Sequence, residues 1–157
     1  MKLICTIIAM AWLTLSASPA GAQGVGVGAR VGASVDPDQF FAGVHFETRD
    51  LAERVRFRPN VEVGIGDDLT LVTLNFEFIY RLPPNAPPLP ASLAMWHLYV
   101  GGGPTLNIFR LTNDTRSEGG FNGLIGFAHD SGLFAEARLG AMNSPSFKFA
   151  VGYTFHP

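Results

Sequence analysis

The last nine residues before the C-terminal dipeptide constrain the fold most, because their side chains alternate between two kinds. Large apolar side chains occupy the odd positions of residues 147–155, and Lys, Ala, Gly and Thr occupy the even ones. Successive side chains of a β-strand point to opposite faces of its sheet. Residues 147–155 are therefore predicted to form a strand with one apolar face and one small or polar face.

The same alternation recurs in seven earlier segments. They cover residues 24–34, 39–49, 56–66, 70–81, 95–109, 120–128 and 132–142. Residues 120–128 are the least regular, because Leu124 is out of phase with Phe121 and Ile125. Pro59 cannot donate a hydrogen bond within a sheet, so it is expected near a strand end or at a bulge. Short links such as Asp130-Ser131-Gly132 separate the segments, and this arrangement predicts an antiparallel all-β fold.

The N-terminus has the features of an export signal. Lys2 precedes an apolar run over residues 3–15, and Ala20-Gly21-Ala22 provides a site for cleavage. We therefore expect residues 1–22 to be a signal peptide and residues 23–157 to form a single β-barrel domain. The only cysteine, Cys5, would be removed with the signal.

Net charge and residue spacing argue against nucleic-acid binding and against a metal site. The formal net charge of −2 argues against nucleic-acid binding, which normally requires a basic patch. His45 and His97, taken with Glu47 and Glu77, do not show the spacing of a metal-ligand set, so neither a metal site nor a cofactor is predicted.

The polar face of the strands indicates a closed interior rather than a solvated surface. Many of the glycines fall on it, which suits the crowded inside of a narrow, strongly curved barrel. Its charged residues are mostly Arg and Glu, and Lys2 and Lys148 are the only lysines in the chain. Arginine is suited to buried, bidentate pairing with carboxylates. The apolar face would then contact lipid.

Strand length and aromatic positions agree with this interpretation. The segments have roughly the 9–11 residues of a tilted membrane-spanning strand, and aromatic residues such as Trp96 and Tyr153 lie near strand ends, where interfacial girdles form. The predicted fold is a closed antiparallel up-and-down transmembrane β-barrel of about eight strands. The alternative is a soluble secreted barrel that buries its apolar face and binds an apolar ligand.

With these features the chain resembles the small outer-membrane barrels of Gram-negative bacteria, typified by OmpX and the transmembrane domain of OmpA. The resemblance implies residence in the outer membrane, contact with lipid and lipopolysaccharide, and a monomeric state. It also implies that the outer-membrane assembly machinery recognises the last strand. The residues of that signal would be Phe149, Val151, Tyr153 and Phe155.

An eight-stranded barrel is just wide enough for side chains to fill its interior, so the inward charges are expected to form a polar plug. The predicted members are Arg30, His45, Glu47, Arg49, Arg56, Arg58, Glu62, Glu77, His97, Glu136 and Arg138, with Asn75 between them. The expected role is non-enzymatic, in envelope structure or surface interaction. The one longer outward link, residues 111–119, is the candidate surface-binding loop. The proline-rich residues 82–92 either form a periplasmic spacer or indicate that the strand count is wrong by one.

One enzymatic alternative remains open. Some eight-stranded outer-membrane barrels are lipid A-modifying enzymes, and the deacylases carry a His-x-Ser element with a downstream Glu. His129, Ser131 and Glu136 resemble that element, although Gly132 replaces the Asn that usually follows the serine. In such an arrangement the histidine activates the hydroxyl and the carboxylate orients the histidine.

Overall fold

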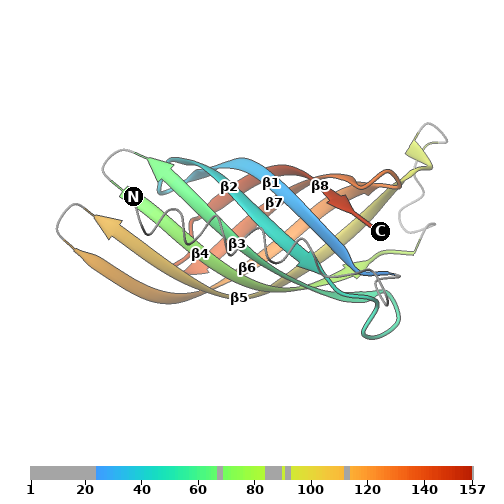
Figure 1. The fold of residues 1–157 in the computed structure, drawn as a ribbon, viewed down its shortest axis with the longest axis horizontal. Coiled ribbons are helices and arrows are strands. Elements are labelled where there is room, and N and C mark those ends of the chain that lie inside the picture. The colour runs from blue at the N-terminus through green and yellow to red at the C-terminus, as the bar shows by residue number, and fades with distance from the viewer. Residues whose placement is uncertain (1–23, 67–68, 84–89, 91–92, 112–113, 157) are drawn as a thin grey trace, which may run out of the picture.

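The computed structural model describes residues 24–66, 69–83, 90, 93–111 and 114–156. Eight antiparallel strands form one closed sheet, in which each strand pairs with its sequence neighbours and β8 pairs with β1 (Figure 1). The strands are β1 (Gly26–Val35), β2 (Gln39–Glu47), β3 (Val55–Gly66), β4 (Leu69–Arg81), β5 (Trp96–Leu111), β6 (Thr115–His129), β7 (Leu133–Met142) and β8 (Phe147–Phe155). The predicted eight-stranded up-and-down barrel is confirmed. The predicted signal peptide, residues 1–22, lies outside the described residues, as does most of the proline-rich segment 82–92.

The barrel has two distinct ends. We call the end where β1 begins and β8 ends the terminal end, which also carries the β2–β3, β4–β5 and β6–β7 connections (Figure 1). The four remaining connections lie at the opposite end. Within the described ranges, no helix is apolar enough over a sufficient length to traverse a bilayer.

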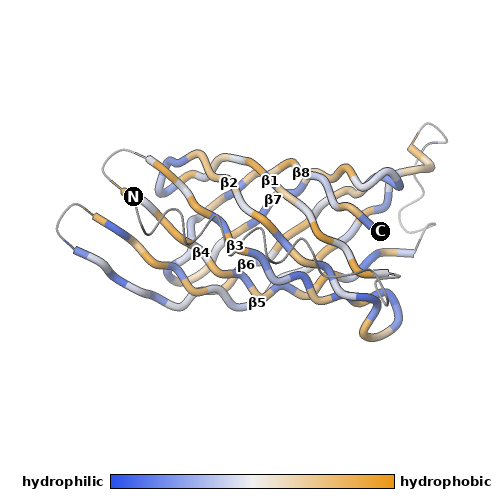
Figure 2. The backbone as a smooth tube through the Cα atoms, viewed as in Figure 1, coloured by the Kyte–Doolittle hydropathy of each residue, from blue (hydrophilic) through white to orange (hydrophobic). Residues whose placement is uncertain are grey.

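The apolar face of the strands points outward. Val63, Phe76 and Phe149 are 42%, 46% and 49% exposed, and these side chains do not meet at a common centre. Along each strand hydrophobic and hydrophilic residues alternate, as Figure 2 shows. The alternative in which the apolar face forms a buried core is therefore wrong, because the closed sheet directs that face away from the barrel axis.

The strand predicted over residues 120–128, the one with the least regular alternation, is longer in the structure. β6 begins at Thr115, and its first residues pair with β5, for example Ser117 with Ile108 and Glu118 with Asn107. Pairing with β7 begins only at Gly120. The predicted outer loop 111–119 is thus mostly the exposed end of a hairpin. Its polar composition suggested a loop, but β5 provides hydrogen-bond partners for its backbone.

Pro59 lies within β3, neither at its end nor at a bulge. It pairs with Phe76 of β4, whereas the register between β2 and β3 runs only as far as His45 and Asn60. The proline therefore sits next to the point where continuous pairing with β2 stops. A residue without an N–H group disrupts a sheet least at such a place.

Inward glycines let the strands and interior side chains approach closely. A Cβ atom on Gly103 would lie 1.9 Å from the carbonyl oxygen of Phe76. A Cβ atom on Gly152 would lie 2.4 Å from the ring of Phe134 and 2.4 Å from the carbonyl oxygen of Ala29. The close approach of neighbouring strands, and of the Phe134 ring to the wall, therefore requires glycine at these positions.

Candidate functional site: the polar interior

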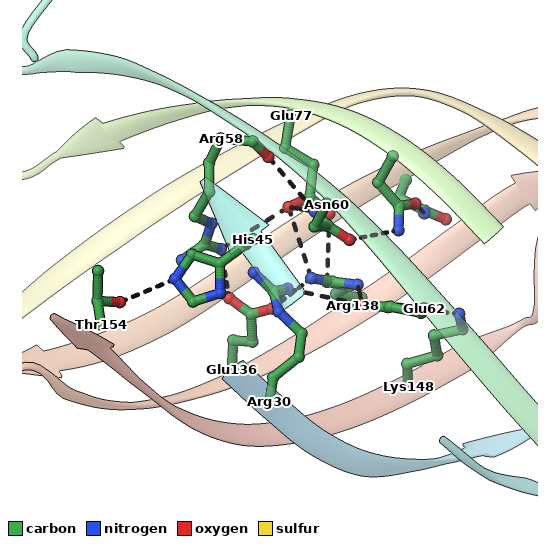
Figure 3. A network of polar contacts seen from close by, with 12 residues as sticks. Arg30, His45, Arg58, Asn60, Glu62, Glu77, Glu136, Arg138, Lys148 and Thr154 are labelled. Carbon is green, nitrogen blue, oxygen red and sulfur yellow. Dashed lines mark hydrogen bonds and ion pairs between the residues drawn. The ribbon is translucent and has the colours of Figure 1, made fainter. Parts of the chain in front are cut away.

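Glu136 of β7 is the centre of the buried network. Its Oε1 atom accepts hydrogen bonds from Arg30 Nη1 at 2.7 Å and Arg138 Nη2 at 2.6 Å. Its Oε2 atom accepts from Arg58 Nη2 at 2.5 Å and from the Tyr99 hydroxyl at 2.9 Å. These donors come from β1, β3, β5 and β7, so one carboxylate joins four strands across the barrel. Figure 3 shows Arg30, Arg58 and Arg138 around Glu136.

Glu62 of β3 forms a second centre, nearer the opposite end. Arg138 Nη1 donates to its Oε1 atom and Lys148 Nζ donates to its Oε2 atom at 2.9 Å. Arg30 Nη1 also lies 3.6 Å from Oε1. The ammonium group of Lys148 lies 5.0 Å from the centroid of the Phe41 ring. Phe41 therefore bounds the network beside Lys148.

A row of amides links the third buried carboxylate to the rest of the interior. Glu77 Oε2 accepts from Asn60 Nδ2 at 2.9 Å, and Asn75 Nδ2 donates to Asn60 Oδ1 at 2.7 Å. Asn122 Nδ2 then donates to Asn75 Oδ1 at 2.8 Å. Arg138 Nε lies 3.3 Å from Glu77 Oε1. Each carboxylate in the interior thus has charged or amide donors within reach.

The Phe134 ring packs against two of the buried arginines and against His45. The guanidinium carbons of Arg30 and Arg58 each lie 5.4 Å from the centroid of the Phe134 ring. His45 packs edge-on against the same ring at 5.4 Å, and its Nε2 atom is 2.9 Å from Thr154 Oγ1. Cations over an aromatic face are attracted by the ring quadrupole. Phe134 therefore packs against the guanidinium faces that the carboxylates leave free.

The terminal end carries a more exposed charge cluster around Glu47. Its Oε1 atom lies 2.6 Å from Arg56 Nη1, 3.5 Å from Arg81 Nη2 and 3.7 Å from His156 Nε2. Arg56 Nε also donates to Asp50 Oδ1 at 2.5 Å. We call these five residues the rim cluster.

Nine of the eleven predicted plug residues are buried or mostly buried. Eight are buried inside the barrel: Arg30, His45, Glu47, Arg58, Glu62, Glu77, Glu136 and Arg138. Arg56 is mostly buried in the rim cluster, with 15% of its side chain exposed.

Two predicted members lie elsewhere. Arg49 has an exposed side chain, because β2 ends at Glu47 and the alternation does not continue beyond it. His97 is 37% exposed at the start of β5, where its Nε2 atom is 2.6 Å from Asp130 Oδ1.

Several interior residues were not among the predicted members. Lys148, Tyr99, Asn60 and Asn122 all contribute hydrogen bonds to the buried network. The strand alternation places Lys148, Tyr99 and Asn60 on the inward face. A pattern of Arg and Glu residues alone does not identify these residues as members of the network.

The His129–Ser131–Glu136 element is divided between two environments. His129 Nδ1 lies 2.9 Å from Ser131 Oγ in the exposed β6–β7 turn. Ser131 also donates its backbone N–H to His129 Nδ1 at 3.1 Å. Glu136 is 2% exposed and bonded to arginines, and no contact of the described residues joins it to the His129–Ser131 pair. The pair alone has the geometry of a side chain closing a turn.

In the part of the chain that the structure describes, no three His, Cys, Asp or Glu side chains gather as a metal-binding group. The proposed assembly residues Phe149, Val151, Tyr153 and Phe155 share the outward face of β8 and are 39–65% exposed.

No family model and no curated protein matches this chain. Two solved structures are similar to it in fold. Neisserial surface protein A (NspA) superposes with a TM-score of 0.62 at 14% identity, over 85% of this chain and 96% of that one. The N-terminal β-barrel domain of Pseudomonas aeruginosa OprF superposes with a TM-score of 0.52 at 14% identity, over 85% and 98% respectively. At this identity the likeness establishes the barrel fold.

Proposed function

We propose that this chain is an integral barrel of a Gram-negative outer membrane, with a closed polar interior and a non-enzymatic role in envelope structure or surface interaction. The observation that carries the proposal is the distribution of side chains: apolar residues encircle the outside of a closed sheet, and the charged residues lie within it. The barrel fold shared with NspA and OprF supports the same location.

The exposed apolar side chains come from all eight strands. One from each strand, in order, is Val31, Phe46, Val63, Phe76, Val100, Ile125, Leu139 and Val151, with exposed fractions from 38% to 66%. A soluble monomer rarely exposes contiguous apolar patches beyond a few hundred Å². Hydrocarbon accepts such a surface, and a closed sheet leaves no backbone edge unsatisfied in it. Lipid is therefore the environment that best suits this exterior.

The side chains of the interior support a closed barrel rather than an open pore. Arg30, Arg138 and Glu136 are each 2% exposed or less and meet across the barrel axis. Passage of a solute would require these ion pairs to separate in a space with little water. A structural or surface-binding role follows more directly than transport.

The outward face of β8 would also serve in biogenesis. Its aromatic and apolar residues, ending in Phe155, are suited to recognition by the outer-membrane assembly machinery. Insertion as a monomer, in contact with phospholipid and lipopolysaccharide, would follow.

Fractionation tests the proposal. The full chain, expressed in a Gram-negative host, is expected to pellet with outer membranes and to resist extraction by carbonate. Unboiled samples should migrate differently from boiled ones in gel electrophoresis, because a closed barrel withstands detergent. Recovery in the periplasmic soluble fraction, with no shift on boiling, would contradict the proposal.

The non-enzymatic role has its own test. Ser131→Ala is expected to leave both barrel folding and lipid A acylation of the host unchanged, because the buried Glu136 does not orient His129. Mass spectrometry of lipid A from cells expressing either form measures this. Loss of acyl chains with the native protein but not with the variant would establish a hydrolase instead.

A further inference from the structure

The β7–β8 connection at the opposite end turns into the barrel instead of standing clear of it. We call residues 143–146 the cap. Pro145, within the cap, is buried, whereas Asp36 and Asp38 in the β1–β2 connection at the same end are exposed. Connecting segments normally run over the surface of a protein. The burial of Pro145 therefore places the cap in the mouth of the barrel.

Hydrogen bonds attach the cap to both sides of this mouth. Asn107 of β5 donates through Nδ2 to the carbonyl oxygen of Asn143 at 2.8 Å and to Ser144 Oγ at 3.3 Å. Ser146 donates its hydroxyl to Asp36 Oδ2 at 3.0 Å and its backbone N–H to the Asp36 carbonyl oxygen at 3.3 Å. Asp36 follows β1, which lies four strands from β5 in the ring of eight. The cap therefore spans the mouth.

The barrel wall has space for the cap because two of its residues are glycines. A Cβ atom on Gly140 would lie 2.1 Å from the carbonyl oxygen of Pro145, and one on Gly120 would lie 2.3 Å from Ser144 Oγ. Larger residues at these positions would displace the cap. With the cap seated, Asn107 beneath it is 0% exposed. The cap thus separates the polar interior from solvent at this end.

The chain enters the cap through a strained residue. Met142, the last residue of β7, has a φ of 62°, which is a left-handed conformation that residues with a Cβ atom rarely adopt. Such strain persists only where other contacts maintain it. The Met142 side chain is 85% exposed, so the hydrogen bonds of the cap are the contacts that can maintain it. Release of the cap would let Met142 relax.

We propose that the cap is a movable closure, hinged at Met142, that controls the access of water and small solutes to the interior at this end. A short segment held by a few hydrogen bonds, part of them exposed, opens locally without unfolding of the whole protein. The ion pairs of Glu136 lie deeper and stay closed, so an open cap exposes a vestibule rather than a pore. This inference goes beyond the proposed function and does not depend on the membrane location.

Thiol labelling tests the proposal at Thr105, which is inward on β5 and 5% exposed. Its hydroxyl has no hydrogen-bond partner within the described ranges, so Thr105→Cys removes no such bond. The site lies beside the cap, because the Cβ position on Gly120 that meets Ser144 is also 3.2 Å from Thr105 Cγ2. The full chain, with Cys5→Ser, is refolded in detergent micelles and treated with a small charged methanethiosulfonate. The thiol should react much more slowly than that of Ser117→Cys on the exposed part of β6.

Loosening the cap should make the buried thiol reactive. In the Thr105→Cys background, Pro145→Gly removes the buried ring and is expected to raise the labelling rate by about tenfold, because the rate follows the population of the open state. Ser117→Gly is the matched control, since it introduces the same residue at an exposed position of the same end and should leave the rate unchanged. Equal labelling of the Thr105→Cys and Ser117→Cys thiols, or equal rates with Pro145→Gly and Ser117→Gly, would overturn the proposal.

A milder variant covers the case in which Pro145→Gly does not refold. Ser146→Ala removes only the exposed side-chain hydrogen bond from the cap to Asp36, and it is expected to accelerate labelling several-fold. An unchanged rate would contradict a movable cap. Unboiled gel migration confirms that each labelled variant is folded. A barrel that pellets with membranes but shows no effect of the cap would overturn only this inference, whereas a soluble barrel would overturn the proposed function.

Discussion

Replacing Glu136 by glutamine is expected to destabilise the barrel by about 3–5 kcal/mol, the cost of removing one partner from a buried ion pair. Glutamine has nearly the same shape as glutamate, so the change removes charge and leaves packing intact. Arg30, Arg58 and Arg138 would then lose their shared counter-ion. Urea-induced unfolding in lipid vesicles, followed by tryptophan fluorescence, measures the free energy.

The control for this substitution is Glu118→Gln. Glu118 pairs with Arg116 on the exposed β5–β6 hairpin, where water screens the pair, so the variant should unfold almost like the native chain. Equal effects of the two variants would mean that the interior is as well solvated as the surface. The interior would then not be a closed polar plug.

A cation on the outer face should be nearly as damaging. Val61 lies in the middle of β3, is 41% exposed and pairs with Val44 and Leu74. Val61→Arg is expected to destabilise the barrel by about 2–4 kcal/mol, because a charge at the bilayer midplane must leave water. The same unfolding measurement in vesicles gives the value.

Leu51→Arg is the matched control for the outer face. Leu51 is 61% exposed in the β2–β3 connection at the terminal end, beyond the spanning strands. Here the cost should fall to about 0–1 kcal/mol, as for positions near the membrane interface. If Val61→Arg were as harmless as Leu51→Arg, the outward face would be in contact with water.

The strand pattern predicted which side of the sheet each residue faces, because that depends only on local alternation. Phe41 and Ile79 are two of the large apolar residues in phase with the polar face, and both are buried inside, at 5% and 3% exposed. Alternation fails where a strand ends, and this explains Arg49: it continues the phase of Glu47 but lies two residues past the end of β2.

The ion pairs inside the barrel could not be predicted in the same way. Glu136 meets Arg30 and Arg58 across 106 and 78 residues of sequence. Which residues lie at the same height along the barrel axis depends on the register of every hydrogen-bonded strand pair around the sheet. His97 shows the same limit. Its side chain is in the inward phase of β5, but it lies at the terminal end of the barrel, where it is 37% exposed. The length of β6 also depended on a partner strand, since β5 pairs with residues that resemble a loop in composition.

The orientation of the two faces is tested most directly by contacts between lipid and side-chain methyl groups. The barrel with labelled methyl groups is placed in lipid nanodiscs, and nuclear Overhauser effects to the acyl chains are recorded. Val63, Ile65 and Val151 should show them, whereas the inward Leu71, Ile79 and Leu124 should not. The reverse pattern, or mutual contacts among Val63, Leu98 and Val151, would contradict the account.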